Sequence, residues 1–167
     1  MSDRSSAGWP RFEVFVLGRH ALQYKHSSSL HASDARHALL LARDVYFRRQ
    51  EGVSLWVALS NSLQENGMPA VAVREAAEPQ QFELFIQFKP GLDHLHVASL
   101  LAESAPQALT QAESAFGAFP PGAVWALPSA ALSCSEPEQR RLFIEPMASK
   151  PYRLPTFFQL PEAVNHM

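Results

Sequence analysis

The chain has 167 residues, 47% of them hydrophobic, and a formal net charge of −2. This length suits one compact domain or two small ones, and the nearly balanced charge gives no electrostatic reason to expect nucleic acid or an anionic membrane as a partner. A single cysteine, Cys134, excludes an internal disulfide framework. With neither a signal peptide nor an apolar run of roughly 18–20 residues that could span a bilayer, the sequence predicts a cytoplasmic protein.

Three strands are predicted in the N-terminal part of the chain. Residues 12–17 are aromatic or branched at most positions, which is typical of a strand. A turn at Gly18 leads to a second predicted strand over residues 22–32. The third strand is predicted at residues 53–59, after a helix.

The helix is predicted from a cap residue and from apolar spacing. Ser33 or Asp34 can serve as the N-cap, because a short oxygen side chain accepts a hydrogen bond from a free backbone N–H. After the cap, six residues fall on one helical stripe, namely Ala35, Ala38, Leu39, Ala42, Val45 and Tyr46. Gly52 is predicted to end the helix.

Residues 12–52 recur without a gap at residues 82–122. Positions that return unchanged after 70 residues include His26, Ser29, Leu30, Ala32, Ala35, Ala38, Leu39 and Ala42. The second helical stripe consists of Ala105, Ala108, Leu109, Ala112, Ala115 and Phe116, followed by Pro120, Pro121 and Gly122 as the helix end and a strand at 123–127. Each copy is one supersecondary unit. The sequence therefore predicts an α+β fold of two tandem ββαβ modules that form a pseudo-dimer, with antiparallel sheets and an extended C-terminal tail.

The repeat also sets the predicted domain boundaries. The first module covers residues 9–63 and the second, more degenerate module covers 81–128. Residues 64–80 and 129–142 are predicted linkers, and residues 143–167 form the tail.

Two blocks of the chain carry a family resemblance. The first block is residues 26–34 and 42–57, and the second is Glu145-Pro146, residues 150–158 and the final His166-Met167. Both blocks resemble the PaaB family, the small B subunits of the multicomponent phenylacetyl-CoA epoxidase. This resemblance covers about residues 9–63 and 143–167. Members of the family are typically one short module followed directly by the tail, whereas a second module stands between the two blocks here.

The resemblance implies a non-catalytic accessory subunit of a bacterial di-iron oxygenase that acts on phenylacetyl-CoA or a related aromatic CoA thioester. Such a subunit would bridge or orient catalytic and companion helical subunits, which hold the di-iron site, and would bind no cofactor itself. The chain's own residues agree, because a carboxylate-bridged di-iron site uses Glu-x-x-His motifs and this sequence has none. The nearest pattern is Asp34 with His37, where Asp34 is better explained as a helix cap. No residue is predicted to be catalytic. The second module is expected to replace one partner of a dimer, and a homo-oligomer is the alternative.

The first helix carries polar residues that the second copy lacks. Arg36, Arg43, Asp44, Arg48, Arg49 and Glu51 align with Pro106, Glu113, Ser114, Ala118, Phe119 and Pro121. Arginine is favoured at interfaces because its planar guanidinium group pairs with carboxylates. We therefore predict that these six residues of the first copy bind a partner, together with Tyr152, Arg153 and Phe157 of the tail. The alternatives are a solvated helix face and a tail that folds back on its own modules.

Two further functions are compatible with the sequence. His94 and His96 lie on the same face of a predicted strand and could ligate a metal with Asp93 or His26 as a third ligand, which would make the chain a small metalloenzyme. The simpler interpretation of His26 and His96 is that each forms a hydrogen bond near the junction of the modules. A stand-alone ligand-binding or regulatory module, with a cleft between the two sheets, is the other alternative.

Overall fold

The computed structural model describes residues 8–47, 52–69 and 78–135. In these residues the strands are β1 (Arg11–Gly18), β2 (Tyr24–His31), β3 (Gly52–Leu59), β4 (Gln64–Glu65), β5 (Gln80–Ile86), β6 (Leu95–Ala102), β7 (Val124–Pro128) and β8 (Ser133–Cys134). The helices are α1 (Ala35–Tyr46) and α2 (Ala105–Phe116), with short 3₁₀ turns η1 (Ser60–Ser62) and η2 (Ser129–Ala131). The predicted α+β class is confirmed. Neither helix is long and apolar enough to cross a membrane.

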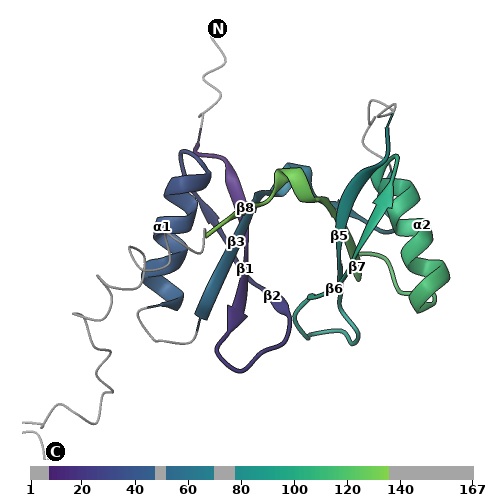
Figure 1. Ribbon diagram of the computed structural model, residues 1–167, viewed down its shortest axis with the longest axis horizontal. Coiled ribbons are helices and arrows are strands. Elements are labelled where there is room, and N and C mark those ends of the chain that lie inside the picture. The colour runs from purple at the N-terminus through teal and green to yellow at the C-terminus, as the bar shows by residue number, and fades with distance from the viewer. Residues whose placement is uncertain (1–7, 48–51, 70–77, 136–167) are drawn as a thin grey trace, which may run out of the picture.

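The strands form one eight-stranded antiparallel sheet in the order β4-β7-β5-β6-β2-β1-β3-β8. We call β1, β2, α1 and β3 the first half, and β5, β6, α2 and β7 the second half. Figure 1 shows α1 and α2 at opposite ends of the molecule with the strands between them. The halves join where Lys25 of β2 pairs with Leu95 of β6, so the separate sheets expected from the sequence are parts of one sheet.

Strand registers agree closely between the halves. The β1–β2 pair shifts register between Val14 and Phe15, and the β5–β6 pair shifts between Leu84 and Phe85. A β-bulge of this kind bends the strand and increases its twist. Both hairpins are therefore bent at equivalent positions.

The predicted cap of the first helix and most of the predicted helix stripes are confirmed. Asp34 is the N-cap of α1, where Oδ1 accepts a hydrogen bond from the His37 backbone N–H at 2.8 Å. Ala38, Leu39 and Ala42 are buried against the first half of the sheet. Val45 is 57% exposed, so its assignment to the buried stripe was wrong. Val45 lies in the last turn of α1, beyond the three buried residues of the stripe.

The second helix repeats this arrangement. Ser104 is its N-cap and accepts a hydrogen bond from the Gln107 backbone N–H. Ala105, Ala108 and Ala112 are buried, and these small side chains let the helix lie close to the strands. Ala115 and Phe116, which were predicted to be on the stripe, are exposed.

Both predicted helix ends were wrong. Helix α1 ends at Tyr46, and Gly52 is instead the first residue of β3. A Cβ atom at Gly52 would lie 2.9 Å from the Phe47 ring, so close packing requires glycine at this position. Helix α2 ends at Phe116 with Gly117 as its C-cap, at φ 94°, a conformation that favours glycine.

Each segment predicted as a linker contains a short strand that pairs with the other half. After β3, the chain passes through η1 and β4 pairs with β7, with Gln64 opposite Ala126. After β7, the chain returns through η2 and β8 pairs with β3, with Cys134 opposite Trp56. We call residues 60–66 and 129–135 the crossing arms. They exchange a strand between the halves, and the predicted tail at 143–167 lies outside the described residues.

Candidate functional site

The two halves pack against each other on the sheet face opposite the helices. The Phe15 and Phe85 rings stack with centroids 4.2 Å apart, and neither side chain is exposed. Beside them, Tyr24 stacks on Trp56 and His94 stacks on Trp125, each at 3.7 Å. The polar groups at the junction of the two halves pack against this aromatic layer.

A buried carboxylate of β1 accepts hydrogen bonds from several polar side chains of the first half. Glu13 is 6% exposed. His26 Nε2 and Ser29 Oγ each donate to its Oε2 at 2.7 Å, and Ser60 Oγ donates to Oε1 at 2.7 Å. The partly exposed Arg11 adds an ion pair from Nε at 3.1 Å. The first crossing arm is therefore tied to β1 through Ser60.

The second half has the same arrangement around Glu83, which is also 6% exposed. Its carboxylate accepts hydrogen bonds from His96 Nε2 at 2.7 Å, from Ser129 Oγ at 2.6 Å and from Ser99 Oγ. Gln81 Nε2 donates at 3.2 Å, in the place that Arg11 takes in the first half. We call the two sets the carboxylate clusters.

Both glutamates are held in the ionised form. Burial alone would raise their pKa, but the hydrogen bonds from histidine and serine outweigh this effect and lower the pKa of Glu13 and of Glu83 to about 2. Because a carboxylate with so low a pKa is a weak base at neutral pH, these clusters are suited to holding strands together and poorly suited to proton transfer.

Each carboxylate cluster also contacts a tryptophan of the opposite half. The His26 ring meets Trp125 edge-on at 4.9 Å, and the His96 ring meets Trp56 at 5.3 Å. The prediction that these histidines form hydrogen bonds near the junction is confirmed. They connect the charged cluster of one half to the aromatic layer of the other.

A pocket of about 480 Å³ opens between the halves next to the first carboxylate cluster. Its lining includes Glu13 and His26 from the first half and Gln87, His94 and Trp125 from the second. At its edge, Lys25 and Asp93 form an ion pair at 3.2 Å that links the two halves. This pocket corresponds to the cleft that a ligand-binding module would use.

The two histidines predicted as a possible metal pair, His94 and His96, bind different partners and do not converge on a common site. His94 Nε2 donates to the Gly122 carbonyl oxygen at 3.0 Å, whereas His96 Nε2 donates to Glu83. Burial lowers the pKa of His94, which favours its neutral form. Across the described residues, no group of three His, Cys, Asp or Glu side chains is placed to hold a metal ion.

The predicted partner-binding residues that the structure describes lie on α1. Arg36 and Asp44 are exposed, and Arg43 donates to Asp44 Oδ1 through Nε at 3.0 Å and Nη2 at 2.8 Å. Beside them, Leu41 is 36% exposed and Val45 57% exposed, an apolar pair next to the charged groups. The remaining predicted residues lie outside the described residues, namely Arg48, Arg49, Glu51, Tyr152, Arg153 and Phe157.

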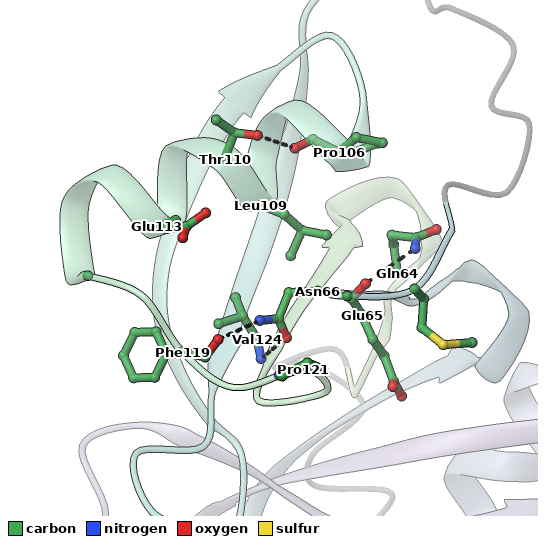
Figure 2. Close-up of a pocket in the computed structure, with 13 residues that line it drawn as sticks. Gln64, Glu65, Asn66, Pro106, Leu109, Thr110, Glu113, Phe119, Pro121 and Val124 are labelled. Carbon is green, nitrogen blue, oxygen red and sulfur yellow. Dashed lines mark hydrogen bonds between the residues drawn. The ribbon is translucent and has the colours of Figure 1, made fainter.

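The second half has a different surface beside its helix. A pocket of about 350 Å³ lies between α2 and the first crossing arm (Figure 2). Asn66 fixes the arm here: its Oδ1 accepts from the Val124 backbone N–H at 2.9 Å, and its Nδ2 donates to the carbonyl oxygens of Phe119 and Pro120. Gly67 follows at φ 81°, where a Cβ atom would lie 2.6 Å from Pro121. The arm is thus packed tightly along one side of the pocket.

Neither the carboxylate clusters nor the crossing arms were predicted from the sequence. One signal for the clusters was present, because Glu13, His26 and Ser29 return 70 residues later as Glu83, His96 and Ser99, and Ser60 returns 69 residues later as Ser129. A glutamate that recurs in an apolar strand together with possible hydrogen-bond donors indicates a buried network in each half. The arms gave no comparable signal, because their strands have only two residues each.

The sequence of the chain matches one protein family and one characterised relative. The model of the PaaB family, described as "Phenylacetic acid degradation B", matches the chain in two segments, residues 8–70 and 78–165. The chain is also similar to the B subunit of the 1,2-phenylacetyl-CoA epoxidase of Escherichia coli (strain K12), with 28% identity over 163 residues, which is 98% of this chain and 99% of that protein. No solved structure matches the chain. The second matched segment shows that the resemblance, predicted only for residues 9–63 and 143–167, extends through the second half.

Proposed function

Because the chain belongs to the PaaB family, we propose that it is a non-catalytic subunit of a multicomponent oxygenase that acts on phenylacetyl-CoA or a related aromatic CoA thioester. In this proposal it bridges or orients the catalytic and companion helical subunits. The observation that carries the non-catalytic role is the state of its buried titratable groups. Glu13 and Glu83 are each saturated by three or more donors and kept ionised, so they serve the fold.

The proposal assigns the di-iron site to a partner subunit. Carboxylate-bridged di-iron centres draw Glu and His ligands from facing helices of a bundle. Here α1 and α2 lie at opposite ends of the sheet (Figure 1), and the described residues bring no three suitable ligands together. Both observations favour an accessory role for this chain.

The proposed partner surface is the outer face of α1 with the residues that follow it. It combines arginines, an acidic residue and the exposed Leu41–Val45 pair, a composition that suits protein interfaces. At the positions of Leu41 and Val45, α2 carries Gln111 and Ala115. We infer that the first half binds the partner and that the second half mainly completes the fold.

We also infer that the two halves arose by internal duplication. In this inference the second half takes the place of the second subunit of a dimer, so that one chain is a pseudo-dimer. Their equal element order, the equivalent bulges and the exchanged crossing arms support this. The inference predicts a monomer in light scattering of the purified chain. An obligate homodimer formed through the face that the second half covers would contradict it.

The function is tested by reconstitution. The chain is co-expressed with the other oxygenase subunits of its own genome, and both assembly and turnover of phenylacetyl-CoA are measured with and without it. We expect the chain to co-purify with a helical subunit that contains Glu-x-x-His motifs, and to be inactive alone. Turnover by the isolated chain would contradict the non-catalytic role.

The surface assignment needs a separate variant. Charge reversal by Arg48→Glu and Arg49→Glu should abolish assembly while the thermal unfolding of the isolated chain stays unchanged. The matched control adds acidic groups to the second half by Ser114→Glu and Ala118→Glu, and it should assemble normally. Normal assembly of the Arg48 and Arg49 variant would contradict this surface.

A second candidate is a stand-alone ligand-binding or regulatory module, favoured by the pocket of about 480 Å³ between the halves. Small-molecule sites often lie in such clefts between units. This candidate predicts that phenylacetyl-CoA or a fragment of it raises the unfolding temperature of the isolated chain. The accessory-subunit proposal predicts no such shift without a partner.

A further inference from the structure

The pocket beside α2 has an apolar wall that the described residues leave open. Leu109 of α2, Phe119 and Pro121 line it (Figure 2). Met68, which is 61% exposed, lines it just after the crossing arm. The arm itself is held rigidly by Asn66, so this wall has a fixed shape. A preformed apolar groove of this kind suits an extended segment that brings apolar side chains.

The same pocket is acidic. Its lining contains Glu65 and Glu113 and no lysine or arginine. None of the ion pairs among the described residues involves either carboxylate. Two carboxylates beside an apolar wall attract a segment that carries positive charge.

On the first half, the second crossing arm takes the place that the first crossing arm takes beside α2. There the second crossing arm lies beside α1, and the chain continues from Ser135 into the C-terminal residues 136–167. The two helices differ in charge, because α2 has Glu113 where α1 has Arg43, which is paired with Asp44. A short basic stretch of the C-terminal residues is therefore favoured beside α2, where the pocket offers two carboxylates.

We propose that the C-terminal segment Lys150–Pro155 docks in the pocket beside α2 of the same molecule. Its sequence is Lys-Pro-Tyr-Arg-Leu-Pro. Lys150 and Arg153 complement Glu65 and Glu113, while Tyr152 and Leu154 supply apolar groups for the wall. The two prolines favour an extended conformation and reduce the entropy lost on docking.

The segment is long enough to reach the pocket. Ser135 is fixed to β3 by a hydrogen bond from its backbone N–H to the Leu55 carbonyl oxygen at 3.0 Å. Leu55 is nine residues from Gln64, which lines the pocket, so the two lie at most about 31 Å apart. The 15 residues from Ser135 to Lys150 span up to about 50 Å when extended.

Zero-length cross-linking of the full chain tests the docking. A carbodiimide joins a lysine to a carboxylate only when the two are in contact, and mass spectrometry of the monomer band identifies the linked residues. We expect a link from Lys150 to Glu65 or Glu113. Links from Lys150 to exposed controls such as Glu78 and Glu103 at equal yield would overturn the proposal. A link to Glu65 or Glu113 found only in a dimer band would overturn docking within the same molecule.

Charge exchange gives an independent measurement. Lys150→Glu with Arg153→Glu should lower the deuterium-exchange protection of α2 and leave that of α1 unchanged. Adding Glu65→Lys and Glu113→Lys should restore it. Protection that is the same in wild type and in the first variant would overturn the proposal. Neither measurement uses a partner subunit. The docking can therefore be disproved while the proposed function stands, and the proposed function can be disproved while the docking stands.

Discussion

The two halves of this molecule agree in what they bury and differ in what they expose. Both contain a carboxylate cluster, a stacked ring on a tryptophan, a hairpin bulge and a crossing arm. The exposed face of α1 carries Leu41, Val45 and a salt-bridged Asp44, whereas α2 has Gln111, Ala115 and Ser114. The buried features that both halves share are therefore required by the fold. The exposed residues that only the first half has are the better candidates for a specific function.

The largest effect should come from the carboxylate clusters. Glu13→Gln and Glu83→Gln each remove the charge on which three donors converge, and each should lower the free energy of unfolding by about 3 kcal/mol. The two losses should be nearly equal, because Arg11, which forms the additional ion pair with Glu13, is largely exposed and contributes little. Urea denaturation of both variants measures this. Losses that differ by more than about 1 kcal/mol would show that the clusters are not equivalent.

The same clusters predict a pH dependence. Each folded-state pKa is about 2, below the ordinary value of 4.5, so the ionised carboxylate stabilises the folded state. That contribution is complete above pH 4.5 and is lost as the pH falls to about 2. Wild type and the double variant Glu13→Gln/Glu83→Gln should thus become closer in stability over this interval. A stability difference that is constant from neutral pH down to pH 2 would contradict the assignment.

The crossing arms are fixed unequally, which gives a smaller effect. Asn66→Ala removes three side-chain hydrogen bonds and leaves the buried Val124 N–H without a partner, so about 2 kcal/mol of stability should be lost. Ser135→Ala removes two hydrogen bonds, from the Leu55 N–H at 3.1 Å and with Ser54 Oγ at 3.4 Å, and should lose about 1.5 kcal/mol, because the Leu55 N–H is also left buried without a partner. Thermal unfolding of the two variants measures the ratio. A larger loss for Ser135→Ala would reverse this comparison of the arms.

The elements of each half could be predicted from the sequence because they depend on local patterns. Helix spacing and the cap at Asp34 depend on neighbouring residues, and the repeat supported each element twice. The ends of the helices were missed because Gly52 and Gly122 had packing and turn roles that resemble a helix stop in sequence. The exchange of β4 and β8 could not be predicted, because a two-residue strand is defined by its distant pairing partner.

The smallest change tests the difference between the helix faces directly. Leu41→Gln with Val45→Ala gives α1 the residues of α2 at these exposed positions, and the free energy of unfolding should change by no more than about 0.5 kcal/mol. If this pair is part of the partner surface, losing its apolar area should weaken binding to the co-expressed oxygenase subunits about tenfold, which is about 1.4 kcal/mol. The reciprocal variant, Gln111→Leu with Ala115→Val, adds an apolar pair to the other half and should leave binding unchanged. Equal affinities of the two variants in titration calorimetry would mean that the helix faces are interchangeable, and the partner surface would then have to lie elsewhere on the chain.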